Sequence, residues 1–148
     1  MDSIKNFVQL TERIGTSGQP TENQFEIISG ADYSVVINLA MPDHPESIST
    51  EGSIVTQLGM DYIHIPVPFD EPKPRHVKHF CEIMHLYEKQ RVYVHCIMNY
   101  RVSAFMYHYL QKVVGLEEKH SRSAMFAEWK PDDVWVSLLQ WNAHDIGL

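Results

Sequence analysis

The chain has 148 residues, which is enough for one domain with a substantial hydrophobic core. Its hydrophobic fraction of 44% and charged fraction of 21% are typical of a soluble globular protein. The formal net charge of −7 argues against a general nucleic-acid or acidic-membrane binder, and no segment reaches transmembrane length.

Short apolar runs bounded by turn residues predict the strands. Residues 33–39 are nearly continuously apolar, as in a buried parallel strand. Residues 13–20 are assigned to a loop, because Ser17-Gly18-Gln19-Pro20 has strong turn chemistry. The predicted strands, the first of which could instead be a turn, cover residues 4–10, 33–39, 61–67 and 92–95.

Apolar residues at helical spacing, together with capping residues, predict the helices. Thr21 and Gln24 have the spacing of a capping box, and Gly115 is placed to stop a helix that begins at Ser103. The last helix carries a tryptophan-rich stripe expected in the core, and any exposed part of it would offer a homodimer contact. The predicted helices cover residues 21–30, 50–58, 74–88, 103–114, 117–127 and 130–141.

The predicted strands and helices alternate along the chain, which is typical of an α/β domain. We therefore expect a single domain over residues 1–148, with a mostly parallel central sheet of four to five strands flanked by helices. Cys81 and Cys96 do not form the pattern of a disulfide scaffold, which favours a reducing compartment. The N-terminus lacks the features of a signal peptide, so we expect a cytoplasmic protein.

Cys96 follows the predicted strand 92–95 and precedes a predicted helix. Backbone N–H groups and the helix dipole make such a loop an anion site, and the same field favours a thiolate over a thiol. A thiolate in this place is a candidate nucleophile. The competing interpretation is a buried cysteine that acts as a small apolar residue.

Arg101 lies five residues after Cys96, and its guanidinium can bind two oxygens of a phosphate or sulfate. Thiolate, backbone amides and arginine together are what phosphoryl transfer through a cysteinyl-phosphate requires. His95 lies inside the strand, where its expected role is to form hydrogen bonds that shape the loop and tune Cys96. The candidate substrate-binding residues are Ile97, Met98, Asn99, Tyr100 and Arg101.

His95-Cys96 followed by Arg101 resembles the signature of the cysteine-dependent protein phosphatases, and more closely that of small bacterial dual-specificity-like tyrosine phosphatases. The resemblance covers most of the chain, most clearly residues 15–110. It implies a cysteine-phosphatase fold and phosphomonoester hydrolysis without a metal or cofactor. Other segments that resemble the family, in the same order, are Thr16-Ser17-Gly18-Gln19-Pro20-Thr21, Val36-Ile37-Asn38-Leu39-Ala40 and Ile65-Pro66-Val67.

The chain departs from the usual family signature around the arginine. Four residues separate Cys96 from Arg101 where the family has five, and Ser103 comes two residues after the arginine. Asn99 occupies the place of a signature glycine, and asparagine tolerates the left-handed backbone that glycine would supply. The guanidinium of Arg101 could therefore point in a different direction.

The resemblance also implies roles for polar residues around the signature. Ser103 would ease departure of the thiolate from phosphorus. Asn38, at the end of its predicted strand, would brace the catalytic loop, and Gln19 would lie near the phosphate-binding loop.

A proline-rich loop over residues 68–74 follows a predicted strand, which is where α/β sheets bind ligands. An alkoxide or phenolate leaves phosphorus with difficulty unless an acid protonates it. The resembled phosphatases place an aspartate in a loop of this kind, so Asp70 is the candidate general acid and Glu71 the alternative. The competing interpretation is a solvated acidic residue.

Three functions are compatible with these residues. The first is a phosphatase that acts on a phosphorylated protein or small molecule, and the second is a rhodanese-type sulfurtransferase, whose cysteine loop is often shorter. The third is a non-catalytic phosphate- or phosphopeptide-binding module. The phosphatase ranks first because residues 15–67 resemble that family and not the rhodaneses.

His76 and His79 share a helix face, but without a third ligand we expect no metal site.

Overall fold

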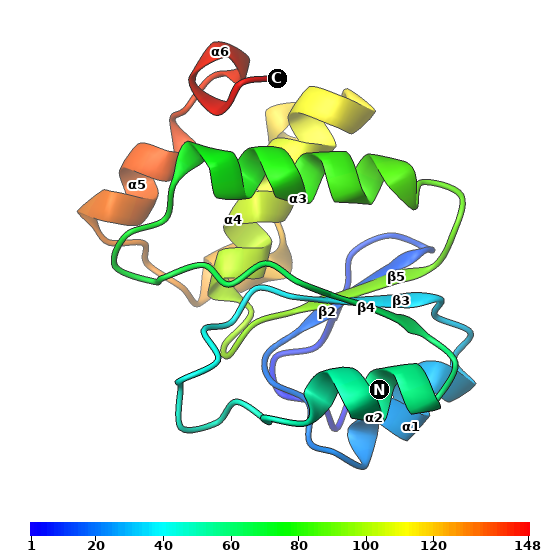
Figure 1. Ribbon diagram of the computed structural model, residues 1–148. Helices are drawn as coiled ribbons and strands as arrows, with labels where there is room; N and C mark the ends of the chain where they lie inside the picture. The colour runs from blue at the N-terminus through cyan, green and yellow to red at the C-terminus, as the bar shows by residue number, and fades with distance from the viewer.

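A five-stranded sheet runs through the middle of the molecule (Figure 1), in a computed structural model that describes all 148 residues. The strand order is β1-β2-β5-β3-β4; only β1 is antiparallel to its neighbour, and the other pairs are parallel. This arrangement confirms the predicted mostly parallel sheet. The strands are β1 (Val8–Gln9), β2 (Ile14–Ser17), β3 (Val35–Asn38), β4 (Asp61–His64) and β5 (Val92–His95).

The assignment of residues 13–20 to a loop was wrong, because residues 14–17 form β2 and pair with β5 along their whole length. The glycine in this strand is needed for packing and not for a turn. A Cβ atom at Gly15 would lie 2.5 Å from the hydroxyl of Tyr33 and 3.0 Å from the ring of Tyr93. The close approach of these side chains therefore explains why glycine, which has a low strand propensity, occupies this position.

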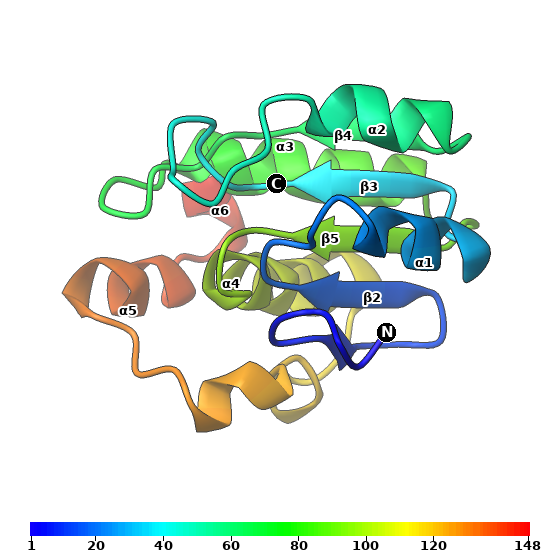
Figure 2. The same ribbon diagram turned by 90° about the horizontal axis from the view of Figure 1, so that it is seen from below.

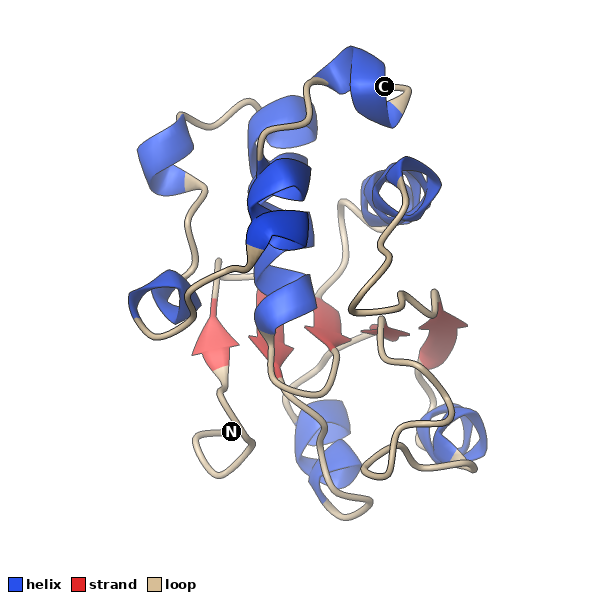
Figure 3. Ribbon diagram, turned by 90° about the vertical axis from the view of Figure 1, so that its left-hand side faces the viewer, coloured by secondary structure: helices blue, strands red, loops and turns tan.

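Helices cover both faces of the sheet, with α1 and α2 on one side and α3, α4, α5 and α6 on the other (Figures 1 and 3). Successive side chains of a strand point to opposite faces. Val92 and Val94 of β5 accordingly join the large core cluster, and Tyr93 joins the smaller one. The helices are α1 (Gln24–Gly30), α2 (Glu51–Gln57), α3 (Pro74–Leu86), α4 (Tyr100–Tyr109), α5 (Asp133–Leu139) and α6 (Ala143–Ile146).

The start of α4 differs from the prediction in a way that matters for the site. The helix begins at Tyr100, three residues before the predicted start at Ser103, directly after the left-handed Asn99 (φ 67°). It continues as a π-helical turn (Leu110–Val114) and ends at Gly115 (φ 89°), which confirms the predicted stop. Arg101 therefore lies in the first turn of α4 and not in the loop.

Three other helix predictions differ from the structure. α1 begins at Gln24 and not at Thr21, although the Gln24 side chain accepts the Thr21 N–H at 2.9 Å, which is one half of a capping box. Residues 117–127 form two 3₁₀ turns, the last predicted helix (130–141) is shortened to α5, and α6 follows beyond its predicted end. The two short helices have separate N-terminal caps, since the side chains of Asp132 and Asn142 each accept a backbone N–H.

The parallel strands end at one edge of the sheet (Figure 2). In the pairing register, Ser17 and Asn38 both stand opposite His95. The loops that follow β2, β5, β3 and β4 therefore converge, which is where ligands bind in sheets of this type. No helix of the chain is both long and apolar enough to span a membrane.

His108 links α4 to α5 inside the core and is fully buried. Its Nε2 donates to the carbonyl of Leu138 at 2.7 Å, so its Nδ1 is free to accept the ammonium of Lys112 at 2.9 Å. Burial, with a smaller contribution from Lys112, lowers the pKa of His108 from 6.5 to about 4. The folded protein therefore holds this imidazole neutral.

We expect the free energy of unfolding to fall as the pH drops from about 6.5 to about 4, because the unfolded chain takes up a proton that folded His108 cannot. The contribution reaches about 3 kcal/mol at the acid end. Urea unfolding at pH 7, 5 and 4 measures it. His108→Gln, whose amide can still donate to Leu138, should show a shallower pH dependence. An identical slope in both proteins would contradict this assignment.

Candidate active site

Cys96 follows β5 and lines a cavity of about 350 Å³. Four of the five predicted substrate-binding residues line the same cavity, and Asn99 does not. The cavity wall consists of His44, Phe69, Cys96, Ile97, Met98, Tyr100 and Arg101. The structure thus brings the candidate nucleophile and the candidate anion-binding arginine into one pocket.

The other cysteine has a different environment. Cys81 lies on α3 in the large core cluster, and burial raises the pKa of its thiol to about 12. It borders a second cavity of about 540 Å³ whose basic side chains are a lysine and a histidine, with no arginine. The larger cavity therefore lacks the chemistry that surrounds Cys96.

Asn99 gives the cysteine loop its shape. Its left-handed backbone (φ 67°) confirms that asparagine replaces the signature glycine in conformation. Its side-chain amide donates to the carbonyl of Asn6 at 2.9 Å and to the hydroxyl of Thr16 at 3.2 Å. Asn99 thus fastens the loop to the N-terminal segment and β2, which accounts for its absence from the cavity wall.

Arg101 is 6% exposed and carries an unused hydrogen-bond donor. Its Nη1 donates to the carbonyl of Val67 at 2.8 Å, and its guanidinium carbon lies 5.7 Å from the centre of the Phe69 ring. Its buried Nε has no partner within the protein. Buried polar groups are almost always hydrogen-bonded, so an anion in the cavity is a fitting acceptor for this donor.

Residues 18 and 19 support the loop from the side of β2. A Cβ atom at Gly18 would collide with the carbonyl oxygen of Ile97, so only glycine allows this approach. The backbone N–H of Gln19 donates to the same carbonyl at 3.0 Å. This contact places Gln19 beside the cysteine loop, where the resemblance located it.

The expected brace between Asn38 and the cysteine loop is not made. The Asn38 amide donates to the hydroxyl of Tyr62 at 3.0 Å, and its oxygen accepts the backbone N–H of Ala40 at 2.8 Å. Asn38 therefore shapes the turn after β3. The buried Ser103 hydroxyl donates to the carbonyl of Asn99 at 2.6 Å, so it too stabilises the turn that carries the loop.

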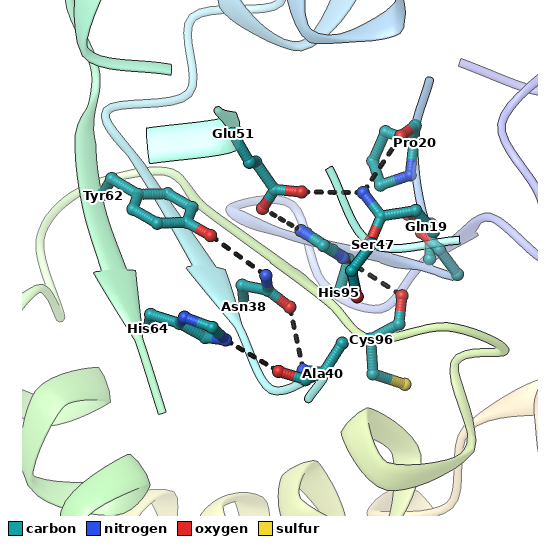
Figure 4. Close-up of polar contacts among 12 residues, drawn as sticks. Gln19, Pro20, Asn38, Ala40, Ser47, Glu51, Tyr62, His64, His95 and Cys96 are labelled. Atoms are coloured by element: carbon teal, nitrogen blue, oxygen red, sulfur yellow. Dashed lines mark hydrogen bonds and ion pairs between the residues drawn. The ribbon is translucent and has the colours of Figure 1, made fainter. Parts of the chain in front are cut away.

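His95 connects the cysteine to a residue that the sequence did not indicate (Figure 4). Its Nδ1 faces the carbonyl of Cys96 at 3.1 Å, and its Nε2 faces a carboxylate oxygen of Glu51 at 2.7 Å. The other oxygen of Glu51 accepts the side-chain amide of Gln19 at 2.7 Å. No local pattern in the sequence indicates this contact of Glu51, because it joins residues 44 positions apart.

The loop that carries the candidate acid is anchored at two points. Arg101 holds the carbonyl of Val67, and the indole N–H of Trp135 donates to the carbonyl of Phe69 at 2.7 Å. The ring of Phe69 lines the cavity and packs on Trp135, with ring centres 5.3 Å apart. Helix α5 thus helps to position the loop between β4 and α3.

Asp70 and Glu71 are both exposed, and neither lines the cavity. A hydrogen bond from Lys73 at 2.6 Å, together with its charge, lowers the pKa of Glu71. A carboxyl held in its ionised form is a poor proton donor. This contact favours Asp70, which directly follows a cavity residue, over Glu71 as the acid.

His44 and Tyr100 complete the cavity wall. His44 comes from the loop between β3 and α2, and its Nδ1 accepts the backbone N–H of Glu46 at 3.0 Å, so any proton on the neutral ring is on Nε2. A histidine in a polar loop has no distinctive spacing, so the sequence did not indicate His44. The ring of Tyr100 stacks on Trp129 with centres 5.1 Å apart, so it forms a fixed wall.

No group of three or more potential metal ligands occurs in the chain.

Comparison with known proteins places these features in one family. Residues 5–133 match the family model described as "DSP-PTPase phosphatase fused to NAD+ Kinase". A search of curated proteins gave no match. Among solved structures, a protein from Shewanella putrefaciens described as a candidate phosphatase (DUF442) is 33% identical, with a TM-score of 0.84; the alignment covers 93% of this chain and 91% of that chain.

More distant structures share the fold. The core catalytic domain of the PP-IP phosphatase SIW14 from S. cerevisiae, bound to citrate, is 12% identical with a TM-score of 0.75, over 97% of this chain and 90% of that one. P. aeruginosa TpbA, a cysteine-to-serine form bound to pTyr, is 15% identical with a TM-score of 0.66, over 82% of this chain and 71% of that one.

Proposed function

This chain belongs to the DSP-PTPase phosphatase family, and from that premise we propose that Cys96 is the nucleophile of its phosphomonoester hydrolysis. The observation that carries the proposal is the shared cavity. Cys96 lines it together with Arg101, whose buried Nε lacks a partner. The comparisons give no support to a sulfurtransferase or to a non-catalytic binding module.

The reaction has two steps. The thiolate of Cys96 attacks phosphorus, the bond between phosphorus and the leaving oxygen breaks, and Asp70 gives that oxygen a proton. Water then attacks the cysteinyl-phosphate, its proton passes to the Asp70 carboxylate, and the sulfur–phosphorus bond breaks to release phosphate. A turn of the Ser103 hydroxyl away from the Asn99 carbonyl would let it stabilise the departing thiolate.

The phosphoryl oxygens need positive charge and N–H donors. Arg101 supplies the unpaired Nε and is held in place through Nη1 by the carbonyl of Val67. The N–H groups of the short loop and of the first turn of α4 supply the rest. The anion-binding site would therefore consist of the cysteine loop and the first turn of α4. The arginine that binds the anion belongs to the helix and not to the loop.

The cavity wall suggests the type of substrate. Phe69, Ile97, Met98 and Tyr100 are apolar or aromatic, whereas Arg101 is its only permanent cation. Such a wall suits a phosphate monoester carried on an aryl or apolar group, as in phosphotyrosine, better than a polyphosphorylated one. Both cysteines are free, and a thiolate nucleophile works in a reducing compartment, which supports a cytoplasmic location.

Hydrolysis of a small aryl phosphate between about pH 5 and 8 tests the proposal. We expect turnover by the wild-type protein and a kcat/KM about 10²-fold lower in Arg101→Lys, which keeps the charge but loses the planar fork. Exposed Arg75→Lys is the matched control and should leave kcat/KM unchanged. Sulfur transfer from thiosulfate without phosphate release would contradict the proposal.

A further inference from the structure

Glu51 is the only buried carboxylate of the chain, with 2% of its surface exposed. Taking a carboxylate out of water is costly unless it is paired and hydrogen-bonded. Glu51 meets this requirement through two side chains, the imidazole of His95 and the amide of Gln19, each at 2.7 Å. Burial alone would raise the pKa of Glu51, but attraction to His95 and these hydrogen bonds outweigh it and lower the pKa.

The contacts of His95 determine its protonation. Its Nε2 faces the ionised carboxylate of Glu51, and its Nδ1 faces the backbone carbonyl of Cys96. Both partners are acceptors without a proton to give, so both ring nitrogens are satisfied only when both carry hydrogen. The ring itself is fully buried. With Glu51 ionised, these contacts favour hydrogen on both ring nitrogens of His95.

We propose that Glu51 is a positioning residue that holds His95 as an imidazolium, and that this buried charge beneath the cysteine loop stabilises the Cys96 thiolate. The inference deepens the proposed function, because it assumes that Cys96 acts as a thiolate. The positive end of the pair is bonded to the Cys96 peptide, and the carboxylate lies beyond the imidazole (Figure 4). Of this pair, which is neutral as a whole, the imidazole is therefore the member nearer to Cys96.

Other charged groups around the pair act separately. On the cavity side, Cys96 shares its pocket with Arg101 from α4 and His44 from the loop after β3. On the opposite side, Glu51 neighbours the hydroxyl of Tyr62 on β4, whose pKa is raised by burial and by the Glu51 charge. Tyr62 therefore stays neutral, and removing the Glu51 charge leaves Arg101 and His44 in place.

Glu51→Gln isolates the charge, because the new amide can keep every hydrogen bond. Its oxygen accepts the amide of Gln19, and its NH₂ donates to Nε2 of His95. A neutral His95 can then still donate from Nδ1 to the Cys96 carbonyl. Glu51→Ala would leave Nε2 of the buried imidazole without a partner and is expected to unfold the protein, so this variant is not informative.

The test is the alkylation of Cys96 by iodoacetamide from about pH 5 to 9, followed by peptide mass spectrometry to separate it from Cys81. Relative to the wild type, we expect Glu51→Gln to lower the rate at pH 6 by about fivefold to tenfold and to leave the rate at pH 9 unchanged. Exposed Glu22→Gln is the matched control and should change neither rate. The acidic limb of the phosphatase pH profile should shift to higher pH in Glu51→Gln alone.

Alkylation needs no phosphatase turnover, so the two proposals fail separately. If wild-type Cys96 reacts readily at pH 6 and Glu51→Gln slows that reaction, the inference holds even where no phosphate is released. If the rates at pH 6 are equal in the wild type and in a folded Glu51→Gln protein, the inference is overturned, even with normal phosphatase activity.

Discussion

Replacing Cys96 with serine is expected to abolish hydrolysis of aryl phosphates while inorganic phosphate still binds. The serine hydroxyl does not ionise near neutral pH, and no base stands ready to activate it, so the first step lacks a nucleophile. Loss of a nucleophile of this kind lowers kcat by about 10⁴-fold or more. Arg101 and the loop amides remain, so phosphate affinity measured by calorimetry should change little.

Cys81→Ser is the matched control for Cys96→Ser. Cys81 is 1% exposed, lies on α3 in the core and does not line the cavity that contains Cys96. Its replacement should lower stability, because a hydroxyl is buried there, and leave the kcat of the folded fraction unchanged. If Cys96→Ser retains turnover, Cys96 is not the nucleophile. The same conclusion follows if only Cys81→Ser loses turnover.

The sequence predicts the centre of this fold better than its edges. β5 is a short β-branched and aromatic run covered on both faces, so local pattern and tertiary contacts favour the same structure. β2 was missed because glycine and serine have low strand propensity, and its stability comes from pairing with β5. The close approach of Tyr33 and Tyr93 at Gly15 cannot be seen in a local window.

In the candidate site, too, local sequence order predicts some residues, and tertiary contacts bring in the others. Cys96, Arg101 and Asn99 lie close together in the sequence, so their grouping was predictable from local order. Glu51 could not be found in this way, because its helix brings it to His95 across 44 residues. His44 reaches the cavity in an analogous manner from the loop after β3.

The early start of α4 gives a physical reason for the unusual cysteine–arginine spacing. Asn99 takes the left-handed conformation directly before the helix, so Arg101 falls in the first helical turn. Its guanidinium then reaches back to the carbonyl of Val67, which fixes the loop after β4 beside the cysteine. The shifted arginine thus couples the nucleophile loop to the loop that carries the candidate acid.

Asp70→Asn is expected to lower kcat by about 10²-fold or more for phenyl phosphate and much less for a nitrophenyl phosphate. An aryl oxide that is a strong base leaves phosphorus only when it is protonated, whereas a nitrophenolate leaves without help. Asp70 directly follows Phe69, which lines the cavity, so its carboxyl is carried by the loop that borders the candidate site. Steady-state kinetics with both substrates at several pH values measure the difference.

Glu71→Gln distinguishes Asp70 from its neighbour. The ion pair with Lys73 already keeps the exposed Glu71 ionised. Its removal should therefore leave kcat for both substrates and the alkaline limb of the pH profile unchanged. Asp70→Asn should instead make the rate depend steeply on the leaving group and abolish the alkaline limb, since that limb reports loss of the acid's proton. If Glu71→Gln shows this pattern and Asp70→Asn does not, the roles of the two carboxyl groups are reversed.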